Sequence, residues 1–196
     1  MRLSRTHFAL VVAALALAPA AGAEEDLPVE GQPAPAFQLR ALNPEASGAA
    51  FVSLDRFAGD EPEDPGSRAV LLSFFASWCA PCQKEMPYLQ QLHQMYRDQG
   101  LRVLSVNIDR EEEGVALARR QIRAAKVTYP VLGDRFNLLA RRYLGEQSSL
   151  PSVFIIRRDG TIARIERGYG KDARTFLLAE VQRALGISRP EEAASK

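Results

Sequence analysis

The sequence predicts an α/β fold in which helices flank a central mixed β-sheet. From about residue 70 to residue 143, strand-like and helix-like segments alternate, which requires parallel strands joined by right-handed crossovers. An Asp159-Gly160 hairpin signature then adds antiparallel strands, and an amphipathic helix closes the series. No internal repeat or boundary divides the 196 residues into two domains, and one domain of this size can bury its own core.

The first half of the chain contains two short strands, a loop, a core strand and a helix. Residues 37–39 and 51–54 are strand-like and predict an N-terminal β-hairpin extension, and the acidic, proline-containing residues 59–67 predict a solvated loop. The apolar residues 70–75 predict a buried strand. A helix is expected from residue 81 to about residue 99, because apolar residues recur at spacings of three and four: Met86, Leu89, Leu92, Met95 and Tyr96.

The second half begins with a strand over residues 101–108, after Gly100 ends the preceding helix. Residues 111–126 predict a helix whose inner face is Val115, Ala118, Ile122 and Ala125. Residues 129–132 are expected to be only a brief apolar connector, and residues 136–143 a short helix.

The last elements are a hairpin and a helix. Residues 153–156 and 161–166 flank the Asp159-Gly160 turn and predict two antiparallel strands. Residues 172–185 predict an amphipathic helix with Phe176, Leu177, Val181 and Leu185 turned inward.

The N-terminus resembles a secretory signal peptide. Arg2 and Arg5 precede an apolar stretch at residues 8–18 and the small residues 21–23, so cleavage after Ala23 is expected, with an uncleaved membrane anchor as the alternative. We expect a linker at residues 24–36, one domain at 37–187 and a flexible tail at 188–196. Export predicts a periplasmic or extracytoplasmic protein with no stable membrane insertion after cleavage.

Charge gives no indication of nucleic-acid binding. The whole chain carries a formal net charge of +1. Removal of residues 1–23 takes away two arginines and leaves 23 basic and 24 acidic residues, a net charge of −1. Such a balance lacks the basic excess that phosphate backbones require.

The segment Trp78-Cys79-Ala80-Pro81-Cys82 contains the only two cysteines and directly follows the buried strand of residues 70–75. With two residues between them, both sulfurs lie on the first turn of a helix, where a disulfide opens and closes without refolding the chain. Unpaired N–H groups and the helix dipole favour an anion there, so Cys79 is the candidate nucleophile and Cys82 the resolving partner. This pattern predicts a redox-active dithiol.

Three other uses of the cysteine pair are possible in principle. A zinc site needs about four ligands, and beyond the cysteines the chain has only His7, inside the leader, and His93. Covalent haem attachment requires a histidine where Gln83 stands. A purely structural disulfide closing so short a loop would stabilise the fold least. We therefore expect no metal and no cofactor.

The chain resembles the exported thiol-disulfide oxidoreductases of the TlpA/ResA type, which have the thioredoxin fold. The resemblance spans nearly the whole mature chain, and its most specific part is the WCxPC run with Glu and Pro downstream. The matching stretches are GQPAPAF at 31–37, VSL at 52–54, LLSFFASWCAPCQKEMP at 71–87, YPV at 129–131, LPSVFII at 150–156 and DGTI at 159–162.

The resemblance implies roles for four further residues. Pro151 matches a cis-proline that faces the dithiol and leaves the backbone of Leu150 free to pair with a substrate peptide. Glu85 matches an acidic residue near the cysteines, where a raised pKa would let it move protons; the alternative is a solvated helix glutamate. Trp78 would offer an apolar surface to substrate or, alternatively, pack in the core. Ser73 stands where thioredoxin has a buried aspartate, so Glu85 is the remaining candidate base.

The expected function is reduction of protein disulfides, with a membrane-bound thiol reductase as electron donor and apocytochrome c thiols or oxidised periplasmic proteins as substrates. A disulfide oxidase is the nearest alternative, because Ala80-Pro81 does not fix the reduction potential. A redox-inert binding module or chaperone is an alternative from another class. A thiol peroxidase is less favoured because its usual thiolate setting, flanked by Pro and Thr, is not found here.

Overall fold

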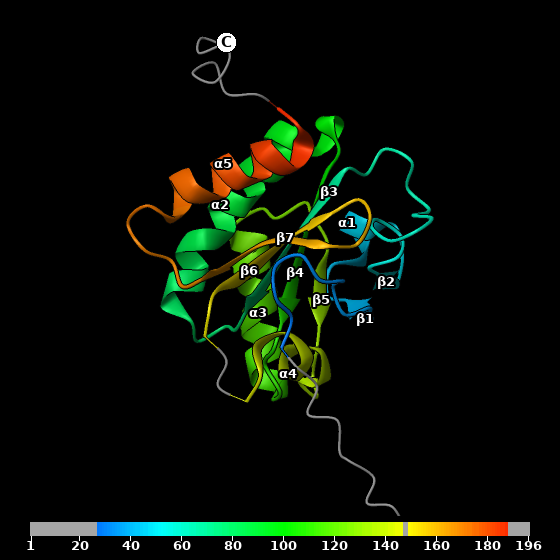
Figure 1. Cartoon of the computed structure of the whole chain (residues 1–196). Helices are drawn as coiled ribbons and strands as arrows, with labels where there is room; N and C mark the ends of the chain where they lie inside the picture. The colour runs from blue at the N-terminus through cyan, green and yellow to red at the C-terminus, as the bar shows by residue number, and fades with distance from the viewer. Residues whose placement is uncertain (1–26, 147–148, 188–196) are drawn as a thin grey trace, which may run out of the picture.

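The computed structural model describes residues 27–146 and 149–187 (Figure 1). The predicted signal peptide at 1–23, the start of the linker and the tail at 188–196 lie outside the described residues. Within the described part, a seven-stranded sheet has the order β2-β1-β5-β4-β3-β6-β7. Its strands are β1 Gln38–Ala41, β2 Phe51–Ser53, β3 Ala69–Phe75, β4 Leu101–Asn107, β5 Val131–Gly133, β6 Ser152–Arg157 and β7 Ile162–Arg167.

The sheet is mixed, as predicted. Strands β3, β4 and β5 run parallel to one another, β6 pairs antiparallel with β3, and β7 pairs antiparallel with β6. On the other side, β1 pairs antiparallel with both β5 and β2, which makes the N-terminal hairpin part of the same sheet. Because β3, β4 and β5 are parallel, their carboxyl ends meet at one edge.

Helices cover both faces of the sheet (Figure 1). They are α1 Pro44–Ser47, α2 Ala80–Tyr96, a 3-10 turn Arg97–Gln99, α3 Glu112–Ala124, α4 Leu138–Leu144 and α5 Ala173–Leu185. Ser73 contacts α2, whereas the ring of its neighbour Phe74 contacts Tyr143 of α4. Successive side chains of a strand point to opposite faces, so α2 and α4 lie on opposite sides. The hydroxyl of Tyr88 donates to Arg174 O, and Gln182 Nε2 donates to the hydroxyl of Tyr96, so α5 lies beside α2 on the same face of the sheet.

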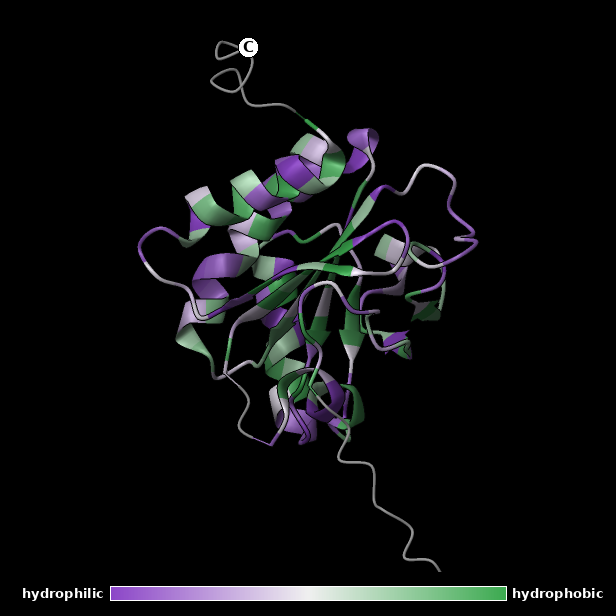
Figure 2. Ribbon diagram, in the orientation of Figure 1, coloured by the Kyte–Doolittle hydropathy of each residue, from purple (hydrophilic) through white to green (hydrophobic). Residues whose placement is uncertain are grey.

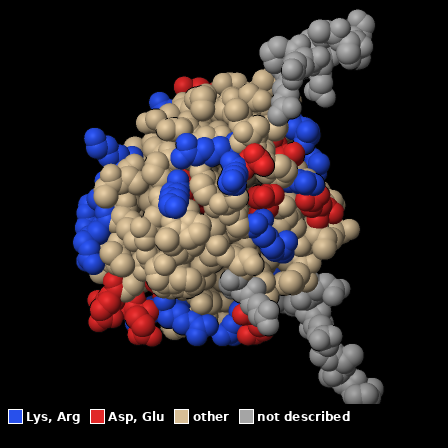
Figure 3. Space-filling model, turned by 90° about the vertical axis from the view of Figure 1, so that its left-hand side faces the viewer, with Lys and Arg blue, Asp and Glu red and all other residues tan. Residues whose placement is uncertain are grey.

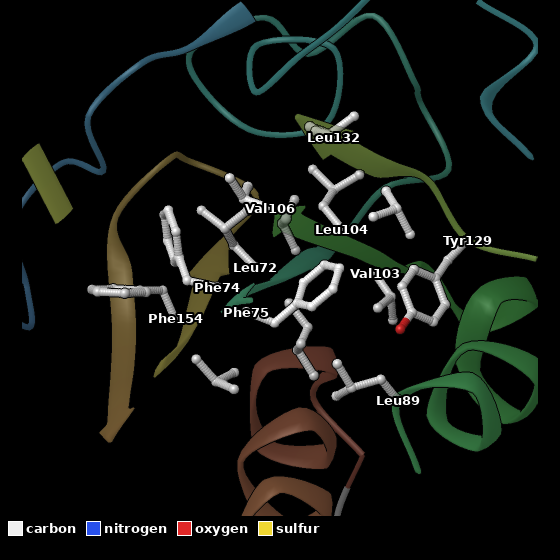
Figure 4. Close-up of a cluster of buried hydrophobic side chains, with 14 of the residues drawn as sticks. Leu72, Phe74, Phe75, Leu89, Val103, Leu104, Val106, Tyr129, Leu132 and Phe154 are labelled. Carbon is white, nitrogen blue, oxygen red and sulfur yellow. The ribbon is translucent and has the colours of Figure 1, made fainter. Parts of the chain in front are cut away.

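The core is centred on β3, all seven residues of which are buried (Figure 4). On the α4 face, the rings of Phe74, Tyr143 and Phe154 pack together, with centroids 4.9–5.8 Å apart. The hydropathy colouring shows the same organisation, with the central strands apolar and the helices mixed (Figure 2). A strand buried on both faces reads as a continuous apolar run, which explains why residues 70–75 were recognisable from the sequence.

Two expectations about local structure are wrong. Residues 129–132 are not merely a connector, because β5 begins at Val131 and pairs with both β4 and β1. Met95 was expected on the inner face of α2 but is 52% exposed, because the buried face of the last turns passes through Leu89, Leu92 and Tyr96 instead. Of the predicted inner face of α3, Ala118 and Ile122 are buried.

The segment before β1 lies along β7. Gly31 N donates to Ile162 O (2.8 Å), Ile162 N donates to Gln32 O (2.9 Å), and Ala34 N donates to Gly160 O (2.9 Å). The carboxylate of Glu30 accepts a further bond from Ile165 N (3.0 Å). Residues 30–34 are therefore part of the folded unit.

The surface carries both signs of charge. On the face shown in Figure 3, basic and acidic side chains are mixed around a broad uncharged area. In the part of the chain that the structure describes, no helix is both long and apolar enough to cross a membrane.

Candidate functional site

The dithiol lies where β3 gives way to α2. Cys79 is the N-cap of α2, and its sulfur accepts a hydrogen bond from the backbone N–H of Cys82 (3.2 Å). The two cysteines form a disulfide, with an S–S distance of 2.00 Å, and both are almost fully buried. Trp78, immediately before them, is 70% exposed, so it is not a core residue. The helix N-terminus at Cys79 is the setting that stabilises a thiolate.

Pro151 lies at the same edge of the sheet as the dithiol. The Leu150–Pro151 peptide bond is cis. Ser152 pairs with Phe74 across β6 and β3, so Pro151 stands opposite the end of β3, a few residues before Cys79. Pro151 is buried and Leu150 is half-buried.

Glu85 is a buried carboxyl group with few partners. It is 1% exposed and lies on α2 one turn after Cys82, on the same helical face. Its Oε2 accepts a hydrogen bond from the hydroxyl of Ser73 (2.9 Å), and among the described residues its Oε1 has no hydrogen-bond partner. Burial raises the pKa of Glu85 to about 7, against the opposing effect of the Ser73 hydrogen bond. A solvated helix glutamate is therefore excluded, and the residue is poised to exchange protons near neutral pH.

Tyr129, a buried titratable neighbour of Glu85, stays neutral. Burial raises the pKa of Tyr129 far above its usual range, and the negative charge of Glu85 acts in the same direction. His93, whose ring packs edge-on against Tyr129 (centroids 5.9 Å apart), has its pKa lowered by burial and by Arg97 and Arg102. His93 is thus half-buried rather than a simple surface residue of α2.

A second buried carboxylate, Asp109, holds the loop before the dithiol. It accepts hydrogen bonds from Ser77 N (2.8 Å), Ser77 Oγ (3.0 Å) and Asn107 Nδ2 (2.7 Å). The carbonyl of Ser77 in turn accepts from Gln83 Nε2 (3.0 Å) and Gln121 Nε2 (2.9 Å). Ser77, two residues before Cys79, is therefore fixed by four hydrogen bonds, two with Asp109 and one each with Gln83 of α2 and Gln121 of α3.

Asp109 and Ser77 were not among the residues predicted from the sequence. A usable signal was present, because Ser77 follows β3 and Asp109 follows β4, and polar residues just beyond adjacent parallel strands meet at one edge. Of the predicted residues, Trp78, Cys79 and Cys82, and Pro151 with its neighbour Leu150, lie at that edge, and Glu85 lies one turn further along α2 against Ser73. Among the described residues, no group of three or more His, Cys, Asp or Glu side chains is arranged to hold a metal ion.

Comparisons with known proteins agree with this geometry. Residues 30–165 match the model of the AhpC/TSA family. The chain is 32% identical over 139 residues to the thioredoxin-like protein YneN of Bacillus subtilis, covering 71% of this chain and 72% of that protein. It is 28% identical over 127 residues to the thiol-disulfide oxidoreductase ResA of Geobacillus kaustophilus, covering 65% of this chain and 67% of ResA.

A solved structure gives the same answer for the fold. The crystal structure of a protein described as a putative thiol:disulfide interchange protein DsbE, from Chlorobium tepidum, superposes with a TM-score of 0.67 at 26% identity. The match covers 81% of this chain and 99% of that one. The resemblance to ResA-type thiol-disulfide oxidoreductases is thereby confirmed: the chain has the thioredoxin-like fold and belongs to the AhpC/TSA family.

Proposed function

We propose that this protein is an exported thiol-disulfide oxidoreductase that reduces protein disulfides, with Cys79, Cys82 and Glu85 as its catalytic residues. The observation that carries the proposal is the arrangement on α2: a dithiol at the helix N-terminus, with a buried carboxyl group one turn further on. The names of the relatives support the reaction class.

The reaction begins with the reduced protein. The Cys79 thiolate attacks one sulfur of a substrate disulfide, which forms a mixed disulfide and releases the first substrate thiolate. Glu85 takes the proton from the Cys82 thiol, and the Cys82 thiolate then attacks the Cys79 sulfur. The second substrate thiolate leaves, and both substrate thiolates become protonated. Two electrons pass from the Cys79–Cys82 dithiol to the substrate, and the protein is left as the disulfide.

Substrate would bind around the exposed indole of Trp78 and along the chain at Leu150 and Pro151. The exposure of Trp78 supports this, since a large apolar side chain next to a reactive sulfur marks a binding surface. Leu150 and Pro151 precede β6, and the backbone there would pair with an extended substrate segment.

The oxidised protein needs a source of electrons. We propose a membrane-bound thiol reductase as the donor, a periplasmic or extracytoplasmic location and, as a substrate class, the oxidised thiols of apocytochrome c during cytochrome c maturation. The signal-like residues 1–23 support export, and the thiol-disulfide oxidoreductase and thiol:disulfide interchange names of the relatives support the exchange chemistry.

Direction is tested by the reduction potential of the mature protein, equilibrated in dithiothreitol or glutathione buffers and followed by alkylation of the thiols. A value at or below about −230 mV supports a reductase, and a value near −120 mV indicates an oxidase instead. Substitution of Cys79 by Ser is expected to abolish insulin reduction. Full activity of Cys79→Ser would overturn the proposal, and unchanged partner binding by a double Cys→Ser variant would favour a redox-inert binding module.

A further inference from the structure

Large apolar side chains are exposed unevenly over this protein. Among the described residues, the three most exposed large hydrophobic side chains are Phe136 (72%), Trp78 (70%) and Leu138 (62%). Trp78 adjoins the dithiol, whereas Phe136 and Leu138 are nearly sixty residues away in the sequence. Exposed apolar groups that gather in one place indicate an interaction surface, so the position of these three decides whether they form one.

The sheet brings the three side chains to one edge. Trp78 follows β3, and Phe136 and Leu138 follow β5, and both strands run parallel to β4, which lies between them. Parallel neighbours are spaced about 5 Å apart, so the ends of β3 and β5 are separated by roughly 10 Å. Ligands of open α/β sheets bind at this carboxyl edge.

The turn that carries Phe136 is firmly built. The buried carboxylate of Asp134 accepts hydrogen bonds from Leu138 N (3.1 Å) and Ala140 N (2.8 Å). Asn137 has a φ of 55°, a left-handed conformation that few residues other than glycine adopt. In the amide orientation that satisfies its hydrogen bonds, the Asn137 side-chain nitrogen donates to Ile108 O and Asp134 O (2.9 Å each). Its side-chain oxygen accepts from Arg110 Nε (3.0 Å). The exposure of Phe136 and Leu138 is therefore imposed by an ordered turn.

A hollow lies between Trp78 and this turn. Ser77, Trp78 and Ile108 line one part of it, and Arg110 and Asn137 line another. A second hollow on the far side of the turn is lined by Phe136, Leu138 and Arg135, among others. Trp78 thus stands beside the first hollow, next to the dithiol, and Phe136 and Leu138 stand beside the second, with Asn137 of the turn between the two.

Charge is divided across this edge. Arg110 and Arg135 are exposed on the side of the β5–α4 turn. Glu111, Glu112 and Glu113 are exposed at the start of α3, and Glu111 lines the same hollow as Trp78 and Arg110. A polypeptide that crosses the edge would be oriented by this division, with its acidic residues toward Arg135.

From these observations we propose that Phe136 and Leu138, together with Trp78, form a docking surface for the polypeptide of a disulfide substrate, which selects a large apolar side chain near the disulfide and acidic residues beyond it. The proposal rests on the proposed function and names the substrate class of that site. It assigns to Phe136, Leu138, Arg110 and Arg135 a role in choosing substrate, with no part in the electron transfer itself.

The test uses oxidised two-cysteine peptides and the reduced mature protein. One peptide carries Phe and two Asp residues after the disulfide, a second has Ser in place of Phe, and a third has Lys in place of both Asp residues. Exchange rates are normalised to the rate with hydroxyethyl disulfide, which is too small to use the surface. We expect the Phe-Asp peptide to react about tenfold faster than the Ser peptide, as partial burial of one aromatic side chain predicts.

Two variants and a control complete the experiment. In a Phe136→Ser/Leu138→Ser protein the normalised preference for Phe is expected to fall about tenfold, and in Arg135→Glu the preference for Asp over Lys is expected to reverse. Met95→Ser, which alters an exposed residue at the other end of α2, should keep both preferences. Circular dichroism and thermal melting of each variant show that it is folded.

Equal normalised rates for the three peptides with the wild-type protein would overturn the docking surface while leaving the proposed function intact. No reaction even with hydroxyethyl disulfide would overturn the proposed function as well. A wild-type dimer in sedimentation that the Phe136→Ser/Leu138→Ser change dissociates, with peptide preferences unchanged, would assign the surface to a second copy of this chain and also overturn the proposal.

Discussion

Two buried carboxyl groups flank the dithiol, and they differ in how many donors the fold gives them. Asp109, after β4, accepts three hydrogen bonds within 3.0 Å. Glu85, on α2, accepts one, and its pKa is raised to about 7. Both are nearly inaccessible to solvent, so burial alone does not decide the behaviour of a carboxyl group. A carboxylate supplied with donors fixes the backbone around it, whereas one without them is left to exchange protons.

The largest loss of stability is expected from removing the Asp109 carboxylate, which accepts three hydrogen bonds. Asp109→Ala leaves Ser77 N, Ser77 Oγ and Asn107 Nδ2 without their acceptor, and each buried donor left unpaired costs free energy. We expect the free energy of unfolding of the oxidised protein to fall by about 4 kcal/mol, measured by urea denaturation. Asp109→Asn, which keeps one acceptor oxygen, should lose roughly half as much. If Asp109→Ala differs from the wild type by less than about 1 kcal/mol, Asp109 does not hold the loop.

The second-largest effect is the pH dependence of the free energy of unfolding that Glu85 causes. Its pKa is about 4.5 in the unfolded chain and about 7 in the folded one, so the folded state binds the proton more tightly. The resulting stability is fully present below about pH 4.5 and is lost as the pH rises to about 7, a change of about 3 kcal/mol. Glu85→Gln keeps the size of the side chain and removes this titration.

The measurement compares urea midpoints of the wild type and Glu85→Gln between pH 4 and pH 8. The disulfide is kept intact, so neither cysteine titrates, and Tyr129, with its raised pKa, stays neutral. The difference between the two proteins should change by about 3 kcal/mol over this range in favour of Glu85→Gln. Parallel curves would show that Glu85 ionises normally, and would contradict the link between its few donors and its raised pKa.

Ser73→Ala removes the one hydrogen-bond donor that Glu85 has among the described residues, and should therefore sharpen the contrast with Asp109. The pKa of Glu85 is expected to rise further, because the Ser73 hydrogen bond lowers it. Hydrogen bonds to charged groups are stronger than those to neutral ones, so the loss of stability should be about 2 kcal/mol at pH 8 and about 1 kcal/mol at pH 4. A loss that does not depend on pH would mean that Ser73 contributes packing alone.

The smallest effect is expected at the Ser77 carbonyl, which accepts from two amide groups. Gln83→Ala and Gln121→Ala should each reduce the free energy of unfolding by less than about 1 kcal/mol, because the other donor remains. The double variant should lose more than the sum of the two, as residues sharing one partner are coupled. Gln94→Ala, at an exposed position of α2, is the matched control. Strict additivity would show that the two amides act independently.

The parts of the site that depend on local sequence could be predicted, and those that depend on the register of distant strands could not. Trp78, Cys79 and Cys82 follow a continuous apolar strand and open a helix, so their positions follow from neighbouring residues. Glu85 was placed by the helical repeat and by family resemblance, but its burial depends on Ser73 lying across the sheet face. Asp109 reaches Ser77 only because β3 and β4 pair in parallel, which no pattern within either strand specifies.

The missed strand β5 has the same explanation. Three residues are too few to show a period, and Val131 becomes a strand residue because β4 and β1 supply partners on both sides. The turn after it was equally hidden: Asn137 and Asp134 are ordinary loop residues in sequence, and only their hydrogen bonds to β4 and α4 reveal the order of that turn.

The segment at residues 30–34 bears on how this protein avoids aggregation. β7 is the last strand on its side of the sheet, and an open strand edge is a template for another chain. Here Gly31, Gln32 and Ala34 occupy backbone groups at 160–162, and the carboxylate of Glu30 covers Ile165 N. A negatively charged group on an edge N–H repels an incoming carbonyl. Under the proposed function, an extended substrate pairs with the backbone beside the sulfurs, and residues 30–34 prevent the same kind of pairing at the outer edge of β7.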